Sequence, residues 1–338
     1  MKAKALVQSL AGCVTACPVF WPLVRRLSLG RVNVIYYHYV GASCSYYKEF
    51  YKGCTVERLR RDLAALSKVY EFVPLQRAVE LNGGAEAPAA PCLAVTFDDG
   101  FDLNKKELQQ LFDEFGVKVT TFVITSCLDN KNLMWRNKLS VIRATVEEEK
   151  YVPKYNALAA KVGRRQISRG SEMMAAASEW DMALKDELAD QLWKDCGLPP
   201  LRDYLDEHQP YFTWDGLQSW IKRGHSVGFH TRTHPRCSQV KPGDLNDEII
   251  VPAKELKEKL GLDWLPFSYP FGDRFPRQTE EELFKNGVFD SAFGIEGFAE
   301  RHTPNHRLER QEMELAGAGW SVFGKAMLGL GPRRTVMA

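Results

Sequence analysis

AVTFDDGFDLN, residues 94–104, begins as an apolar run and continues into two adjacent aspartates, a glycine and a third aspartate. Strand interiors usually lack aspartate, so the strand is expected to give way to a turn where the acids begin. Two neighbouring carboxylates repel each other unless a cation or hydrogen-bond donors hold them. The stretch therefore predicts either an ordinary strand-to-helix turn or a place where a cation binds.

The segments around this stretch alternate between strand and helix patterns. Residues 31–40 are β-branched and aromatic, residues 55–70 carry leucines at helical spacing behind Thr55 as N-cap, and residues 104–116 form a helical pattern before the strand pattern at 117–125. The links between them are short. Such alternation predicts an α/β fold with parallel strands.

The alternation stops from about residue 129 to residue 212, where charged, Ala- and Leu-rich sequence predicts helices only. We interpret this part as an inserted helical subdomain. Alternation resumes at 213–230, where Thr213 is expected to cap a helix, and continues through 263–275 and 282–297.

The predicted organisation is one α/β domain over residues 31–310 that contains the helical insertion. A basic and apolar segment, residues 1–30, precedes it, and a tail, residues 311–338, follows it. The 338 residues are 45% hydrophobic and 26% charged, which is typical of a globular protein. The net charge of +2 gives no electrostatic support for nucleic-acid binding.

The eight cysteines are scattered along the chain without a CxxC pair. This pattern favours reduced thiols over a disulfide framework or a zinc knuckle.

Residues 1–30 combine lysines and arginines with an apolar stretch that polar residues interrupt. The stretch is too broken for a membrane span, which needs about 20 apolar residues. We favour a segment in peripheral contact with a membrane surface, and a docking helix or an export signal are the alternatives. The expected location is cytoplasmic, with peripheral contact at the inner membrane as one option and export as the alternative.

A second polar cluster, HTRTH at 230–234, follows a strand pattern as the aspartates do. The carboxyl ends of parallel strands meet at one end of a barrel, so the two clusters are expected to converge. One aspartate and two histidines suit a divalent transition metal with open positions for water and substrate. The neighbouring aspartate can act as general base. The cation interpretation of the opening stretch is therefore preferred.

Three motifs in this order, TFDDG (96–100), HTRTH (230–234) and SYPFG (268–272), resemble the polysaccharide deacetylase family, which shares the NodB homology domain and belongs to carbohydrate esterase family 4. YYHYV (36–40) is similar to the opening strand of its bacterial surface-glycan branch. The resemblance implies a deformed parallel (β/α) barrel. It also implies metal-dependent removal of an N-acyl group, chiefly N-acetyl, from an amino sugar in surface polysaccharide or glycolipid biosynthesis.

The resemblance also assigns roles to residues. Asp98 is implied as catalytic base, and Asp99, His230 and His234 are implied as ligands of zinc, or of cobalt or another divalent ion. The backbone N–H of Phe271 is implied as an oxyanion donor, in a substrate-contacting turn with Tyr269 and Pro270.

The chain departs from the family pattern at two places. Ser268 stands where the family often has an arginine that steadies the base, and Arg274 is a candidate to replace it. The histidine that serves the family as general acid is sought at His302 or His306, with Asp290 as its supporting acid.

Further polar and aromatic residues have structural interpretations. His38 is assigned to packing, with a place at the rim of the site as the alternative. Trp135 and Trp214 are assigned to the core or to anchoring the subdomain, with stacking on a glycan as the alternative. Thr231 and Thr233 are expected to orient the histidines. The alternative function is a degenerate, non-catalytic carbohydrate-binding protein. The sequence leaves open whether the sugar is part of a polymer, nucleotide-linked or lipid-linked, and what the oligomeric state is.

Overall fold

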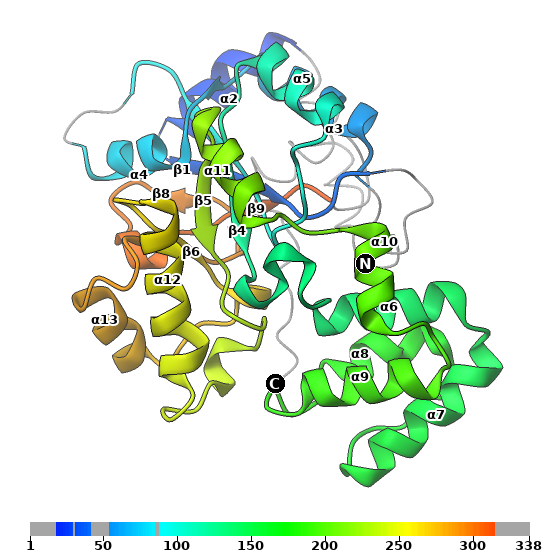
Figure 1. Cartoon of the computed structure of the whole chain (residues 1–338). Helices are drawn as coiled ribbons and strands as arrows, with labels where there is room; N and C mark the ends of the chain where they lie inside the picture. The colour runs from blue at the N-terminus through cyan, green and yellow to red at the C-terminus, as the bar shows by residue number, and fades with distance from the viewer. Residues whose placement is uncertain (1–17, 30, 42–53, 85–87, 315–338) are drawn as a thin grey trace.

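The computed structural model describes residues 18–29, 31–41, 54–84 and 88–314. Its main feature is a curled, mostly parallel sheet that forms a half-barrel (Figure 1). The strands follow the order β7-β6-β5-β4-β3-β1-β8, with β2 beside β3 and β9 beside β1, and only the pairing of β1 with β8 is antiparallel among the strands described. The predicted α/β fold, a deformed parallel barrel, is confirmed in this form.

The strands are β1 (Arg31–Tyr37), β2 (Glu71–Phe72), β3 (Cys92–Phe97), β4 (Val119–Val123), β5 (Ser226–Phe229), β6 (Pro266–Ser268), β7 (Ser291–Phe293), β8 (Ala299–Glu300) and β9 (Gln311–Glu312). The α-helices are α2 (Trp21–Ser28), α3 (Val56–Leu66), α4 (Leu75–Gly83), α5 (Lys106–Phe115), α6 (Trp135–Thr145), α7 (Glu148–Lys161), α8 (Met173–Ala177), α9 (Lys185–Asp195), α10 (Leu201–His208), α11 (Trp214–Lys222), α12 (Val251–Leu260) and α13 (Arg277–Lys285).

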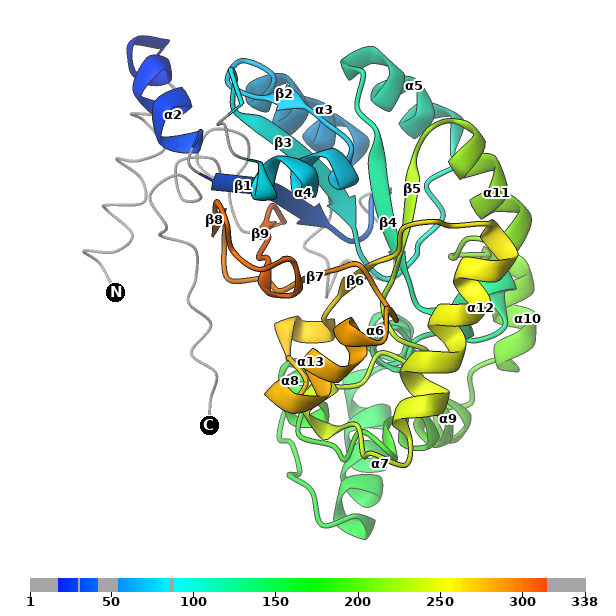
Figure 2. The ribbon, with the colours of Figure 1, turned by 90° about the vertical axis from the view of Figure 1, so that its left-hand side faces the viewer.

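Side chains of the strands alternate between two faces of the sheet. Ile35 and Val95 belong to the outer core, where α3, α5, α11 and α12 cover the sheet (Figure 2). Val34, Ala94 and Phe122 belong to a smaller inner core, to which α4 contributes. Beyond the ends of the strands, residues that keep to the same face as Val34, Ala94 and Phe122 therefore point into the half-barrel.

Two of the predicted helix starts have the expected caps. The Thr55 hydroxyl accepts a hydrogen bond from the N–H of Arg58 over 3.2 Å, and the Thr213 hydroxyl accepts one from the N–H of Gly216 over 3.0 Å. Each cap satisfies one N–H group that the first helical turn leaves without a partner.

Helices α6–α10 form a separate cluster between β4 and α11, at the lower right of Figure 1, where the insertion was predicted. Its own hydrophobic core contains Trp135, Tyr155 and Trp180, with the last two rings stacked at 5.7 Å. Trp214 lies outside this cluster, on α11, where the Lys259 ammonium lies 4.6 Å from its ring centre.

The predicted domain boundary at residue 310 is wrong. β9 pairs in parallel with β1, and the N–H of Met313 donates to the carbonyl of Tyr36 over 3.1 Å. The domain therefore extends at least to Glu314, because its last strand completes the sheet beside β1. The rest of the predicted tail lies outside the described residues.

Of the N-terminal segment, residues 1–17 lie outside the described part and α2 lies within it. Helix α2 buries Val24 and Ser28, and the Ser28 hydroxyl lies 3.0 Å from that of Tyr70. None of the described helices has the length and apolar character needed to cross a membrane. The cysteines at 54, 92, 127, 196 and 237, those within the described residues, are all free thiols.

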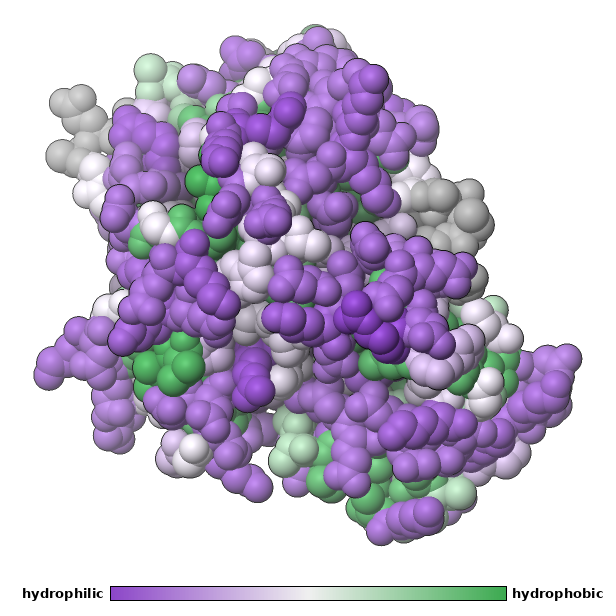
Figure 3. Space-filling view, viewed as in Figure 1, coloured by the Kyte–Doolittle hydropathy of each residue, from purple (hydrophilic) through white to green (hydrophobic). Residues whose placement is uncertain are grey.

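The surface seen in Figure 3 is mostly hydrophilic, and its hydrophobic residues form small separate groups.

Candidate active site

The two adjacent aspartates of the opening stretch, Asp98 and Asp99, directly follow β3, where the chain enters a left-handed turn. Asp99 and Gly100 have φ angles of 69° and 73°, a conformation that costs side-chain-bearing residues energy and suits glycine. A Cβ on Gly100 would lie 3.1 Å from the Cα of Val123, so the close neighbouring strand also requires glycine here. The turn leaves both carboxylates buried at the carboxyl end of the sheet.

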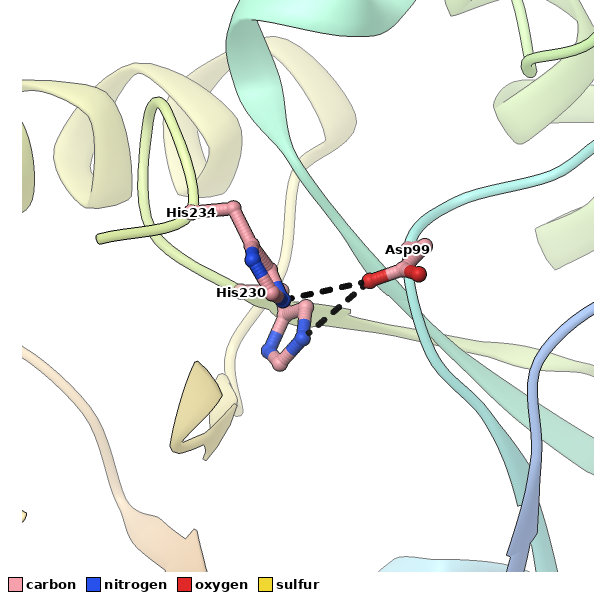
Figure 4. Close-up of side chains that lie close together, drawn as sticks. All are labelled: Asp99, His230 and His234. Atoms are coloured by element: carbon pink, nitrogen blue, oxygen red, sulfur yellow. Dashed lines mark ion pairs between the residues drawn. The ribbon is translucent and has the colours of Figure 1, made fainter. Parts of the chain in front are cut away.

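Asp99, His230 and His234 lie together, as the sequence predicted (Figure 4). The Asp99 Oδ1 atom lies 3.4 Å from the Nε2 atom of each histidine. All three side chains are buried. Tetrahedral zinc with ligands at its usual bond lengths separates ligand atoms by about 3.4 Å, so the spacing fits such an ion.

The protonation of the three groups also fits a metal ion. The His230 Nδ1 atom lies 2.7 Å from the carbonyl oxygen of Ser268, which can only accept, so Nδ1 carries the hydrogen and Nε2 keeps its lone pair toward Asp99. Burial lowers the pKa of His234 well below its usual value, which keeps this imidazole neutral. Burial alone would raise the pKa of Asp99, but the neighbouring histidines lower it.

Asp98, the neighbouring residue, is held by an arginine that the sequence did not reveal. Nη1 and Nη2 of Arg310 donate to the two carboxylate oxygens of Asp98 over 2.7 and 2.8 Å. The same guanidinium donates to the hydroxyl of Ser268 over 2.6 Å and to that of Thr96 over 3.1 Å. Burial alone would raise the pKa of Asp98, but the charge of Arg310 lowers it, so the carboxylate is ionised.

Arg274, the candidate of the sequence analysis, does not replace the family's arginine. Its guanidinium binds Glu280 and Glu309 over 3.1 and 2.7 Å. Arg310 occupies the place beside Asp98 instead, and it reaches the hydroxyl of Ser268, the residue that stands at the family's arginine position. No local pattern marks Arg310, because it lies 212 residues from Asp98 in sequence.

The loop that carries the two histidines is fixed by hydrogen bonds within it. The hydroxyl of Thr231 accepts from the N–H of His234 over 2.9 Å. The N–H and hydroxyl of Thr233 donate to the two carboxylate oxygens of Glu248 over 2.6 and 2.9 Å. Both threonines therefore orient the loop, in agreement with the sequence-based interpretation.

The inserted helices also contact this loop. Lys185 of α9 donates to the Thr233 hydroxyl over 2.8 Å, and its side chain is 4% exposed. The indole N–H of Trp135 donates to the carbonyl of His234 over 3.3 Å. The helical insertion thus supports the loop of the two histidines directly.

The SYPFG turn faces the same site. Phe271 has a φ angle of 60°, and its ring packs edge-on against His234 at 4.6 Å. Among the described residues, the N–H of Phe271 has no hydrogen-bond acceptor, which leaves it available to a ligand. The buried Pro270 fixes the turn, and the Tyr269 hydroxyl donates to Glu280 over 2.6 Å.

Neither candidate general acid of the sequence analysis lies in the site. His302 is exposed, and its N–H donates to the carbonyl of Asn82. His306 packs against Phe284 at 5.1 Å. Asp290 accepts from the N–H of Leu265, just before β6 begins and at the end opposite the site. The expected positions are wrong because this segment turns away from the barrel interior.

His38, which the sequence analysis assigned to packing, lines the site instead. Its Nδ1 atom lies 2.6 Å from Oε2 of Glu314, and its backbone N–H donates to Oε1 over 2.9 Å. Burial alone would lower the pKa of His38, but the charge and hydrogen bond of Glu314 raise it to about 9. The alternation of side chains along the strand could have revealed this position, because His38 lies on the same inward-facing side as Val34 and Tyr36.

These groups share one pocket with an empty volume of about 600 Å³, part of it open to solvent. It is polar on the strand side and partly aromatic and basic on the side of α6. The lining residues are Tyr36, His38, Asp98, Asp99, Met134, Arg136, His230, His234, Tyr269, Phe271, Ile295, Glu312 and Glu314.

Comparisons with known proteins agree with this geometry. The sequence model of the family described as "Polysaccharide deacetylase" matches residues 85–288, which hold the aspartate turn, the inserted helices and the histidine loop. No curated protein matches the chain.

Several solved structures share the fold. The deacetylase PplD of Streptococcus pyogenes superposes with a TM-score of 0.56 at 14% identity, over 88% of this chain and 98% of that one. IcaB from Ammonifex degensii gives 0.52 at 17% identity, over 87% and 96%. The de-N-acetylase from Aggregatibacter actinomycetemcomitans gives 0.53 at 12% identity, over 84% and 96%.

Proposed function

Because the chain belongs to the polysaccharide deacetylase family, we propose that it hydrolyses the N-acyl group, chiefly N-acetyl, of an amino sugar with one divalent metal ion. The observation that carries the proposal is the cluster of Asp99, His230 and His234 beside an ionised Asp98. Two imidazole nitrogens and one carboxylate oxygen favour zinc and also suit cobalt.

A metal ion held by these three residues would supply Lewis-acid polarisation of the amide carbonyl and a water of lowered pKa. Asp98 accepts the proton of the attacking water, and Arg310 fixes the direction of its carboxylate. The N–H of Phe271 donates to the carbonyl oxygen as negative charge develops on it.

The amine that leaves when the C–N bond breaks requires a proton. We assign this step to His38, because it lines the pocket and Glu314 keeps it protonated at neutral pH. The carboxylate of Glu314 orients the imidazole and stabilises its charged form, as an acid partner of a catalytic histidine does. Water oxygen joins the acyl carbon, and the products are a free amino sugar and a carboxylate such as acetate.

The non-catalytic alternative rested on a missing arginine and a missing histidine. Arg310 and His38 fill both roles from other positions in the chain. The full set of base, metal ligands and acid supports an enzyme.

We further propose that the enzyme acts in surface polysaccharide or glycolipid biosynthesis at the cytoplasmic face of a membrane. Support comes from the N-terminal segment, where Val19 and Leu23 are 79% and 55% exposed. Arg25 and Arg26 are exposed beside them. Exposed apolar and basic side chains on a helix favour a membrane surface.

Release of acetate from N-acetylated amino sugars tests the proposed function. The purified chain is stripped with a chelator, reloaded with zinc or cobalt and assayed against neutral, nucleotide-linked and lipid-linked sugars. We expect acetate release that the chelator abolishes and either metal restores. Tight sugar binding by a fully metal-loaded protein with no acyl release would favour the carbohydrate-binding alternative.

A further inference from the structure

Two arginines from separate parts of the chain approach one aromatic ring at the rim of the pocket. Arg136 lies in the first turn of α6, and Arg236 lies in the loop just after His234. The guanidinium carbon of each lies 5.0 Å from the centre of the Phe271 ring. Because that ring also contacts His234, the two positive charges lie beside the proposed metal site.

The two side chains are half-buried, so the positions of their charges are restricted. Arg136 is one of the residues that line the pocket. Within the described residues, no carboxylate lies at ion-pair distance from Arg236, whereas Arg274 and Arg310 each bind acidic side chains. The charge of Arg236 therefore remains available to a ligand.

The charges of the pocket are divided between its two sides. Asp98, Glu312 and Glu314 line the side formed by the strands, where Arg310 pairs with Asp98 and His38 pairs with Glu314. Arg136 lines the side formed by α6 and the SYPFG turn. A neutral sugar needs no such separation. A substrate with an anionic group gains from the arginine side, whereas the cations on the strand side are already paired with carboxylates, so this difference would fix which way the sugar lies.

We propose that Arg136 and Arg236 bind a phosphate group attached to the amino-sugar substrate. This inference rests on the proposed function and narrows its substrate class. Guanidinium groups bind phosphate oxygens through paired hydrogen bonds, and two of them match the charge of a phosphate better than that of a single carboxylate. Stacking on Phe271 holds both groups in place before the substrate arrives.

A glycosyl phosphate occurs in nucleotide-linked sugars and in lipid-linked sugars, and both present the same chemistry to the arginines. The test compares four substrates: N-acetylglucosamine, its 1-phosphate, a nucleoside-diphosphate ester of it and a polyprenyl-phosphate ester in detergent micelles. The measured quantity is kcat/KM for acetate release by the metal-loaded full chain.

We expect kcat/KM for the 1-phosphate to exceed that for the neutral sugar by about 10- to 100-fold, in line with charge-assisted hydrogen bonds. Arg136→Gln and Arg236→Gln should each lower this ratio about tenfold. Arg164→Gln, which removes an exposed arginine of the same inserted subdomain, is the matched control and should leave the ratio unchanged. The ester with the higher kcat/KM then shows whether the sugar is carried by a nucleotide or by a lipid.

A binding measurement separates substrate recognition from loss of structure. Glucose 1-phosphate, which has no acyl group to lose, should inhibit the wild type and inhibit both variants more weakly, while their metal content stays at the wild-type level. If the ratio of kcat/KM for the 1-phosphate to kcat/KM for the neutral sugar is equal in wild type and variants, and the neutral sugar is still deacetylated, the phosphate site is overturned and the proposed function stands. No acetate release from any substrate by metal-loaded wild type would contradict the proposed function itself.

Discussion

Arg310 binds Asp98 through two hydrogen bonds of 2.7 and 2.8 Å, although 212 residues separate them in sequence. The arginine is fully buried, and its guanidinium also lies 4.7 Å from the ring centre of Tyr36. The pair therefore fixes the direction of the Asp98 carboxylate and holds it ionised in a place where burial alone would protonate it.

Replacing Arg310 with methionine should shift the acidic limb of the rate profile to higher pH. The base must be ionised, so the rate falls as pH drops through the pKa of Asp98, and this pKa rises when Arg310 no longer lowers it. A buried carboxylate without its partner should also cost about 3–5 kcal/mol of stability. A pH series of kcat/KM and thermal unfolding measure the two effects.

Arg274→Met is the control, since Arg274 binds Glu280 and Glu309 and has no contact with Asp98. It should lower stability without moving the acidic limb. An unmoved acidic limb in Arg310→Met would mean that another group acts as base.

His230→Ala should remove the metal ion. The variant loses one of three protein ligands. Substitution of residues that only hold such ligands in place already lowers metal affinity about 10- to 100-fold. Elemental analysis of the purified protein measures the metal content, with His302→Ala as an exposed control. Full metal content in His230→Ala would disprove the ligand assignment.

His38→Gln should lower kcat by roughly 10²- to 10⁴-fold, the usual contribution of a positioned acid or base. The acid must be protonated, so the wild-type rate should fall as pH rises through the His38 pKa of about 9, and the variant should lose this limb. His302→Gln and His306→Gln should stay within a few-fold of wild type. An unchanged alkaline limb in His38→Gln would contradict this assignment.

The raised pKa of His38 also links protonation to stability. Its stabilising contribution should be complete below about pH 6.5 and should be lost as pH rises through about 9. Denaturant unfolding of wild type and His38→Gln across this window should show a pH dependence in the wild type that the variant lacks.

The cluster of Asp99, His230 and His234 could be predicted because each residue belongs to a short motif at the end of a strong strand pattern. Asp99 and His230 directly follow this pattern, and parallel strands bring their ends together. Arg310 and Glu314 could not be predicted, because they flank β9, a strand of two residues that no periodicity reveals. Their contacts depend on its register beside β1, which only the folded sheet determines.

The position of the proposed general acid could not be predicted from the sequence for a different reason. His302 and His306 lie where the family's order of motifs places a histidine, but the fold turns them away from the pocket. His38 lies in the pocket because of strand alternation. The alternation is visible in the sequence, but the sequence does not show which of the two faces of the strand lies inside the half-barrel. That depends on which face α4 covers.

Lys185→Met should weaken metal binding although Lys185 is no ligand. The ammonium group donates to the Thr233 hydroxyl, one residue before His234, and it is buried beside Asp186 at 2.8 Å. Loss of this support should lower metal affinity about 10- to 100-fold and speed hydrogen exchange at residues 230–234. Metal titration and exchange of the full chain measure both, with the exposed Lys161→Met as control. Unchanged affinity and exchange would show that the inserted helices do not support the loop.

The N-terminal helix provides the last prediction. If α2 rests on a membrane, the full chain should sediment with vesicles that contain anionic lipid, and high salt should release it, because each basic residue near such a surface contributes about 1 kcal/mol. Replacing Leu23 on α2 and Val19, in the short 3₁₀ turn just before it, by serine removes these exposed apolar side chains and should abolish sedimentation. Metal content and turnover of a soluble substrate should stay at wild-type levels, because neither side chain lines the pocket. Turnover of a lipid-linked substrate in vesicles should fall. Wild-type protein that stays in the supernatant with anionic vesicles at low salt would refute membrane contact through this helix.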